Sequence, residues 1–407
     1  MSFRLFSISS MYQGSIDSFY ITHPGVSSLN YNDHLAILLA DTTEFVGVYL
    51  RNFRKLGIES ECAIANEPFL QSKWGKERGI QKEKTANILF DQVLSFSPDV
   101  LLIENLSYVT PELISNIRHN VKSVRLIVAN HCSPFNQKVL ESLKNVDFVF
   151  TCTPGLKSAI EVLGKKSYVV YHGFDADLLP MLNPDITVPK KDLVFSGSLI
   201  SGGDFHTQRI RLIERIIKEN MPIELYVNLE NPYKIKVKQS IYLLSNFLRM
   251  IKMEKMINDF RLLQYGKSWV DSYSNALLRN CKLPLYGMDM FNLFLNSRIV
   301  LNFHIGVAGN YAGNMRMFEV TGIGSCLLTD NKKNMEELFK TGSEVVVYDN
   351  VEDCIEKATW LLEHEEERKM ISKAGQMRTL KYHTVEIRCR SIIEIINKEL
   401  LFQVKKV

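Results

Sequence analysis

The chain has 407 residues, which is long enough for two or three domains that each bury a core of their own. Lys and Arg (49) exceed Asp and Glu (45) by only four, so bulk charge does not favour a nucleic-acid-binding protein. Seven scattered cysteines without a Cys-x-x-Cys pair argue against a disulfide scaffold or structural zinc site and favour a reducing cytoplasm. No apolar run approaches the ~18–20 residues of a membrane span, and the N-terminus lacks the pattern of a secretory signal.

Apolar runs and amphipathic segments alternate through the first 176 residues. The predicted strands are 3–9, 59–65, 98–103, 124–129, 148–151 and 168–171. The predicted helices are 33–56, 86–96, 111–119, 138–143 and 155–163, and a polar loop is expected between the first strand and Asn30. Strands that are apolar throughout, separated by such helices, predict a parallel sheet covered on both faces. Residues 1–176 are therefore expected to form a doubly wound, Rossmann-like domain.

A second alternating series follows a proline-containing linker at 177–191. Its predicted strands are 193–196, 223–227, 299–303, 325–329 and 344–348. Its predicted helices are 206–219, 315–321, 334–339, 351–364 and 366–380. This series predicts a second doubly wound domain over 192–383, and we expect 384–407 to form a helix that crosses back to the first domain. The fold class is thus α/β, with two domains facing across a cleft.

Residues 231–282 interrupt the second series and differ from it in charge. They hold ten basic residues against three acidic ones (Glu254, Asp259 and Asp271), with apolar residues at helical spacing. We interpret the segment as a basic helical insert. Two roles stay open: peripheral contact with an anionic membrane or lipid-linked acceptor, or a solvated face of the second domain.

The segment 313–330 (GNMRMFEVTGIGSCLLTD) carries the strongest motif. A Gly-containing loop opens a helix in which Arg316 and Glu319 lie one turn apart, and Gly322 and Gly324 close it. Backbone N–H groups at such a helix start, together with Arg316, can hold a diphosphate, and Glu319 can hold ribose hydroxyls. The alternative is a surface ion pair beside a tight turn.

The wider order of elements resembles the donor half of GT-B glycosyltransferases. A Leu285-Tyr-Gly287 loop, a helix, the strand 299–303, a Gly-rich loop and the Arg/Glu helix follow one another. Arg316-Met-Phe-Glu319 … Gly324 is similar to the R-x-F-E … G stretch of the CgeB-like branch of that fold. The resemblance implies a nucleotide-sugar donor held by the second domain and an acceptor presented by the first. It covers most of the chain and excludes the basic insert.

The same resemblance implies individual roles. Arg316 would contact the donor phosphate, Glu319 the ribose, and Gly287 the nucleobase. Further donor-binding candidates are Ser196, Gly197, Ser198, Arg209, His304 and Asn314. One departure is clear: family-four enzymes have a Glu eight positions before the residue matching Glu319, and here that position is Tyr311. Retaining or inverting stereochemistry is therefore left open.

Candidate bases come from the first domain. His131 follows a predicted strand, where cleft residues belong, and imidazole suits proton transfer near neutral pH. Asp17 and His23 lie in the loop expected after the first strand. No His/Cys/Asp cluster has metal-ligand spacing and no Asp-x-Asp occurs, so we expect no metal, with a helix dipole and Arg or Lys stabilising the leaving group.

The sequence therefore predicts a metal-independent glycosyltransferase that uses a nucleotide-sugar, UDP-linked by expectation, and no other cofactor. The acceptor would be a glycan, a lipid-linked molecule or a protein, in the cytoplasm or peripherally at the inner membrane face, and no nucleic-acid partner is expected. Two alternatives stay open on the same fold: a nucleotide-sugar epimerase, and a non-catalytic sugar- or nucleotide-binding protein.

Overall fold

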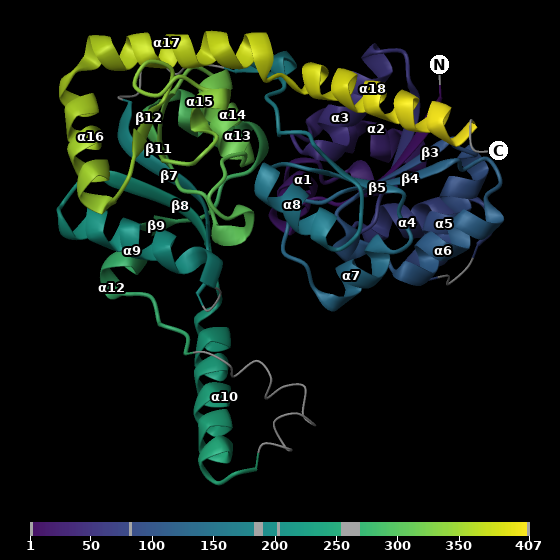
Figure 1. The fold of residues 1–407 in the computed structure, drawn as a ribbon, viewed down its shortest axis with the longest axis horizontal. Helices are drawn as coiled ribbons and strands as arrows, with labels where there is room; N and C mark the ends of the chain where they lie inside the picture. Colours follow the sequence, from purple (N-terminus) through teal and green to yellow (C-terminus); the bar gives the residue numbers. More distant parts are fainter. Residues whose placement is uncertain (1–2, 81–83, 183–189, 202–203, 254–268, 405–407) are drawn as a thin grey trace.

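The computed structural model describes residues 3–80, 84–182, 190–201, 204–253 and 269–404 (Figure 1). Within these residues, the strands form two six-stranded sheets in which every neighbouring pair is parallel. The first sheet consists of β1 (Arg4–Ser9), β2 (Glu59–Ile64), β3 (Val100–Glu104), β4 (Leu126–Asn130), β5 (Phe148–Thr151) and β6 (Ser167–Val169). The second consists of β7 (Lys191–Leu199), β8 (Ile223–Leu229), β9 (Cys281–Lys282), β10 (Ser297–Asn302), β11 (Cys326–Asp330) and β12 (Val346–Tyr348). The expected α/β class with two doubly wound sheets is confirmed.

The first sheet has the order β2-β1-β3-β4-β5-β6. The chain moves to one side of β1 for β2 and to the other side for β3, so the winding reverses between β1 and β3. The helices on its faces are α1 (Gln13–Thr22), α2 (Tyr31–Asp41), α3 (Phe45–Lys55), α4 (Pro68–Glu77), α5 (Thr85–Phe96), α6 (Pro111–Asn120), α7 (Gln137–Leu143) and α8 (Pro154–Val162). In such sheets the carboxyl ends of the strands at the reversal leave a crevice where ligands bind.

Three predictions for the first domain were wrong. The loop expected before Asn30 contains α1, whose buried side chains are only Ile16 and Phe19, too few for a clear periodic signal. The single helix expected over 33–56 is two helices, α2 and α3, because the backbone at Thr42 and Glu44 is extended. The sequence analysis also missed α4, which begins at a proline and is capped by the Glu67 carboxylate.

The second sheet has the order β12-β11-β10-β7-β8-β9, so its winding reverses between β7 and β10. Its helices are α9 (Asp204–Lys218), α10 (Pro232–Met250), α12 (Asn275–Asn280), α13 (Gly287–Leu295), α14 (Met315–Gly322), α15 (Met335–Leu338), α16 (Val351–Glu363) and α17 (Glu365–Tyr382). Strand β7 is longer than predicted and pairs with β8 as far as Leu199. Ser196, as predicted, and also Gly197 and Ser198 therefore lie within this strand, near its carboxyl end.

The basic insert is partly helical. Helix α10 projects away from the second domain, whereas α12 lies against it and β9 joins β8 at the edge of the sheet (Figure 1). Residues 254–268 of the insert and residues 183–189 of the expected linker lie outside the described residues. Residues 176–181 at the start of that linker form a short 3-10 helix.

Helix α18 (Val385–Val404) returns to the first domain and covers one face of its sheet (Figure 1). Its apolar side chains from Val385 to Leu400 share a buried cluster with residues of α3 and of β1, β3, β4 and β5. Where the chain crosses between the domains, Phe174 and Thr384 lie side by side in a parallel bridge. Phe174 packs into the core of the second domain, against Gly322, where a Cβ atom would lie 2.2 Å from its ring. Among the described helices, none is both long enough and apolar enough to cross a bilayer.

Candidate active site

A pocket of about 240 Å³ lies between the two domains. The first domain lines it with residues at the carboxyl ends of β3 and β4, and the second domain lines it with residues of α13 and α14. The lining includes Glu104, Asn130, Cys132, His172 and Glu319. A larger cavity of about 460 Å³ is lined by Arg4 and Phe6 of β1 and by Trp74, within the first domain alone. The interdomain pocket is the better candidate site because it lies at the carboxyl ends of the strands.

Glu319 lines the second domain's side of this pocket, and Arg316 forms an ion pair with it. The Arg316 Nη1 atom lies 2.7 Å from Glu319 Oε2, and both side chains are mostly buried, with 17% and 11% of their surface exposed. The guanidinium also stacks over the Phe294 ring, 4.6 Å from its centre. The ion pair and the ring contact hold both charges in a fixed orientation beside the pocket, partly shielded from water.

The loop that leads into α14 is held by side-chain amides. Asn314 donates to Asn302 at the end of β10 (2.7 Å), and Asn334 both accepts from the Ala312 N–H (2.7 Å) and donates to its carbonyl (3.0 Å). Gly313, between Ala312 and Asn314 in the chain, has φ +154°. A Cβ atom at this position would lie 2.4 Å from the carbonyl oxygen of Cys152 in the first domain. The start of α14 is therefore fixed against both sheets.

Arg209 lies at the reversal of the second sheet. Its guanidinium donates to the carbonyl of Ser198 at the end of β7 (3.0 Å) and to that of Phe303 after β10. His206 Nδ1 also contacts the Ser198 carbonyl, at 3.0 Å. Burial lowers the pKa of Arg209 to about 10. Arg209 thus bridges the two strand ends. It shapes the crevice and places a positive charge beneath it.

His304 and Gly287 have different environments. His304 is buried, and its Nδ1 atom lies 2.7 Å from Asp330 Oδ1. Burial raises the pKa of Asp330, but the neighbouring His304 and Lys332 outweigh this effect, so the pKa of Asp330 is lowered. Gly287 opens α13 with φ +54°, next to Tyr286, whose ring packs against Gly14 of α1. Neither His304 nor Gly287 lines the interdomain pocket.

The structure argues against His131 as the base. Its side chain is fully buried, contacts Ser133 Oγ at 3.2 Å, and packs against the Phe135 ring. Burial lowers the pKa of His131 to about 4, which makes it a weak base at neutral pH. Its position after β4 is as predicted, but Asn130, Cys132 and Ser133 line the pocket in its place.

The two weaker candidate bases lie on α1 or at its end. Asp17 is exposed and accepts a hydrogen bond from Gln13 Nε2 (2.8 Å). His23 ends the helix, with its ring stacked on Phe19 at 4.7 Å. Neither residue lines the interdomain pocket.

Glu104 is a pocket carboxylate that the sequence analysis missed. It ends β3, at the reversal of the first sheet, and its Oε2 atom accepts from the Ser10 N–H at 3.3 Å. Burial, with a smaller contribution from Glu44, raises the pKa of Glu104 to about 8. Burial likewise raises the pKa of Glu44, the residue before α3, to about 7. Its position in the sequence could have identified it as a candidate, because Glu104 directly follows the predicted strand 98–103.

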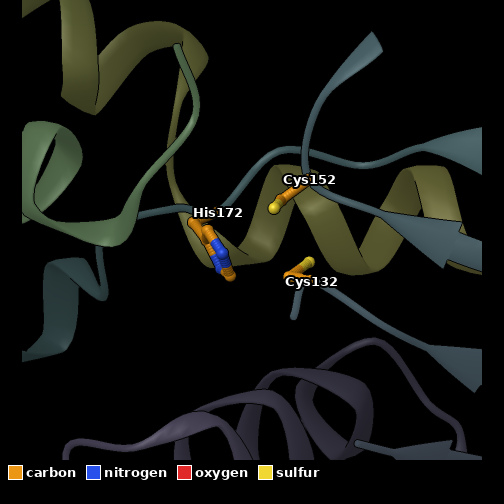
Figure 2. Close-up of side chains that lie close together, drawn as sticks. All are labelled: Cys132, Cys152 and His172. Carbon is orange, nitrogen blue, oxygen red and sulfur yellow. The ribbon is translucent and has the colours of Figure 1, made fainter. Parts of the chain in front are cut away.

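Three residues of metal-binding types cluster at the first domain's side of this pocket, and two of them, Cys132 and His172, line it. Cys132, Cys152 and His172 follow β4, β5 and β6, and their ligand atoms all lie within 4.8 Å of one another (Figure 2). Because these residues are twenty positions apart in the chain, no short spacing motif could reveal them. The absence of a metal-ligand spacing in the sequence thus does not prevent three such residues from meeting in the fold.

Comparison with known proteins supports the fold. Residues 244–394 match the sequence model of a family described as "Glycosyl transferase-like". No curated protein sequence matches the chain significantly. Among solved structures, HepE of Anabaena in complex with UDP-glucose superposes with a TM-score of 0.57 at 11% identity, over 97% of this chain and 100% of HepE. The chain has the GT-B fold.

Two further structures with this fold are similar over nearly the whole chain. An alpha-glucosyltransferase in complex with UDP-glucose and DNA containing an abasic site has a TM-score of 0.56 at 11% identity, over 98% of this chain and 100% of its own. Sucrose-phosphate synthase of Thermosynechococcus elongatus has a TM-score of 0.55 at 7% identity, over 98% and 100%. These GT-B structures share the arrangement of two facing domains with the present chain.

The raised pKa of Glu104 predicts a pH-dependent effect of Glu104→Gln on stability. An unfolded glutamate has a pKa near 4.5, and the folded value is about 8, so the native state binds the proton more tightly. The free energy of unfolding of the wild type therefore falls as pH rises from about 5 to 8. The variant has no titrating carboxyl at this position, so its free energy of unfolding does not fall for this reason. We expect the melting temperature of the variant, relative to wild type, to increase steadily over that interval.

Differential scanning calorimetry from pH 5 to 8.5 would measure this difference. Glu112→Gln, an exposed position in the first turn of α6, is the matched control and is expected to show no such trend. A difference for Glu104→Gln that stays constant across the interval would contradict the raised pKa.

Proposed function

We propose that the chain is a glycosyltransferase that moves a hexose from a UDP-linked donor to an acceptor hydroxyl, and that it belongs to the CgeB-like branch. The observation that carries the proposal is Glu319, which lines the interdomain pocket of a GT-B fold and is paired with Arg316. The family match over 244–394 supports the reaction class. The UDP-glucose in two similar structures supports the choice of donor.

The donor would bind against the second domain. Arg316 and the N–H groups at the start of α14 would hold the diphosphate, since both carry positive charge toward the pocket. Glu319, whose Oε2 atom already lies 2.7 Å from Arg316, would accept hydrogen bonds from the ribose hydroxyls. When the bond between the sugar carbon and the phosphate oxygen breaks, these groups stabilise the negative charge on the departing UDP without requiring a metal.

The first domain would supply the base. The Glu104 carboxylate would take the proton of the acceptor hydroxyl while the hydroxyl oxygen forms its bond to the sugar carbon. A pKa of about 8 places this group close to the operating pH, where general-base catalysis is most effective. Glu104 thus provides a carboxylate from the first domain, whereas the second domain has Tyr311 at the position where family-four enzymes have Glu. The donor side would then be shaped by the remaining donor-binding candidates: Ser196, Gly197, Ser198, Arg209, Gly287, His304 and Asn314. Of these, Arg209 and Asn314 would be positioning residues.

Arg316→Ala is predicted to weaken UDP binding by about 10- to 100-fold, because it removes a charge-assisted hydrogen bond to phosphate. The melting temperature should change little, since the pair remains partly open to the pocket. Isothermal titration calorimetry with UDP and with UDP-glucose measures the affinity.

Arg390→Ala is the matched control, because Arg390 forms an exposed ion pair with Glu386 on α18 (2.7 Å). This variant should bind UDP as wild type does. If Arg316→Ala left UDP affinity intact and instead lowered the melting temperature sharply, the pair would be structural and the donor assignment would fail.

Glu104→Gln is predicted to slow sugar transfer by about 10²-fold or more while UDP-glucose affinity stays near the wild-type value. In the wild type, the rate should rise with pH up to about 8, because the carboxylate must be ionised to accept a proton. Release of UDP from UDP-glucose, with water or a panel of hydroxyl acceptors, measures the rate. If the Glu104→Gln variant transferred sugar at the wild-type rate across this pH range, Glu104 would be excluded as the base.

One observation also favours a nucleotide-sugar epimerase. That reaction needs additional acid and base groups in the cleft, and Glu104 with its neighbour Glu44 provides two carboxyls with raised pKa values on the first domain. Incubation of UDP-sugars without an acceptor distinguishes the two activities. An epimerised sugar would identify the epimerase, whereas hydrolysis without epimerisation favours the transferase.

We also propose that α10 brings the enzyme to an anionic membrane surface, where a lipid-linked acceptor would be accessible from the cytoplasm. Exposed apolar side chains recur at helical spacing along one face of α10: Tyr233 (78% exposed), Val237 (56%), Leu244 (49%) and Phe247 (53%). Lys234, Lys236 and Arg249 are exposed on the same helix. An exposed apolar stripe flanked by cations matches the chemistry of an anionic lipid interface.

Replacement of Val237 and Phe247 together by Glu is predicted to lower co-sedimentation with phosphatidylserine-containing vesicles about tenfold or more, because both apolar anchors are lost and negative charge is added. Val162→Glu is the matched control, since Val162 is 87% exposed on the C-terminal end of α8 in the first domain. Equal sedimentation of all three proteins would assign α10 a role other than membrane contact.

A further inference from the structure

Two thiols and an imidazole converge at one edge of the first sheet. Asn130 pairs with Phe150 and Phe150 with Tyr168 across β4, β5 and β6. Cys132 and Cys152 each lie two residues beyond their paired positions. Figure 2 shows both sulfur atoms and the His172 ring directed toward a common space. Three neighbouring strand ends thus each contribute one ligand atom, and all three atoms lie within 4.8 Å.

This spacing is close to that of a tetrahedral zinc site. With Zn–S distances near 2.3 Å and Zn–N distances near 2.1 Å, the ligand atoms of such a site lie about 3.5–3.8 Å apart. A contraction of about 1 Å or less, within reach of side-chain rotation, would complete the geometry. Two thiolates and an imidazole are also soft donors, which prefer Zn²⁺ over Mg²⁺ or Ca²⁺.

The backbone around the cluster is held in place. Arg388 Nε of α18 donates to the carbonyl of His172 at 3.0 Å. The carbonyl of Cys152 lies against Gly313, where a Cβ atom would lie only 2.4 Å away. Such contacts fix the ligands before a metal arrives, which lowers the cost of ordering them.

We propose that Cys132, Cys152 and His172 bind a thiophilic divalent cation, Zn²⁺ being the best match, with its fourth position open to the interdomain pocket. Cys132 and His172 line that pocket, whereas Cys152 is buried behind them. Three protein ligands with one open position is the arrangement of zinc sites that also take a water or a substrate group. The ion would thus place a Lewis acid on the first domain, on the acceptor side, and the proposal does not depend on the identity of the donor.

Cobalt(II) titration of the full-length, chelator-treated protein in a non-thiol reductant tests the site. We expect thiolate-to-cobalt charge-transfer absorption and intense visible d–d bands at one ion per chain, both abolished by equimolar Zn²⁺. Cys132→Ser, Cys152→Ser and His172→Ala should each weaken Co²⁺ binding at least about 100-fold, since even neighbours of metal ligands cost 10–100-fold. Cys281→Ser, a half-buried cysteine of β9 outside the cluster, is the matched control and should bind like wild type.

A second measurement does not depend on the folding of any variant. In the wild-type protein, one equivalent of Zn²⁺ should slow alkylation of Cys132 and Cys152, but not of Cys281, as read by peptide mass spectrometry. Absence of cobalt charge-transfer bands, bands that survive Cys132→Ser and Cys152→Ser, or equal alkylation with and without Zn²⁺ would overturn the proposal. Formation of a Cys132–Cys152 disulfide without Zn²⁺ binding by the reduced protein would also overturn it.

Discussion

The crossing of two chain segments between the domains is the constraint on which the site depends. The Phe174 N–H donates to the His383 carbonyl and the Val385 N–H donates to the Phe174 carbonyl, both at 2.9 Å. Arg388 adds hydrogen bonds from its guanidinium to the carbonyls of His172 and Tyr382. Because α18 then packs on the first sheet, the two segments that cross between the domains are hydrogen-bonded to each other at the crossing. This arrangement turns the carboxyl ends of both sheets toward a common pocket.

Each sheet contributes a different chemistry from the reversal of its winding. In the second sheet, Arg209 spans the ends of β7 and β10 and supplies positive charge beneath the crevice. In the first sheet, Glu104 ends β3 and carries a carboxyl whose pKa burial raises to about 8. The division suits a reaction in which a diphosphate leaves on one side and a hydroxyl loses its proton on the other.

Burial decides which of two plausible groups can act as a base. His131 and Glu104 both lie at strand ends next to the pocket, and burial shifts both pKa values. For a histidine burial disfavours the charged acid form, so the pKa of His131 falls to about 4 and its basicity is lost. For a glutamate burial disfavours the charged base form, so the pKa of Glu104 rises into the range where it can both accept and release a proton.

The sequence by itself determined the alternation of strands and helices, because the apolar period depends only on which residues face a core. It also located the Arg316/Glu319 helix, since those two residues are one turn apart and the motif is local. It could not show that β7 extends through Ser198, that α1 exists, or that Glu104 faces a pocket. Cys132, Cys152 and His172 meet only because three parallel strands lie side by side, and pKa values follow from burial. Contacts between distant segments and the dielectric around them are properties of the tertiary structure, and these decided the rest.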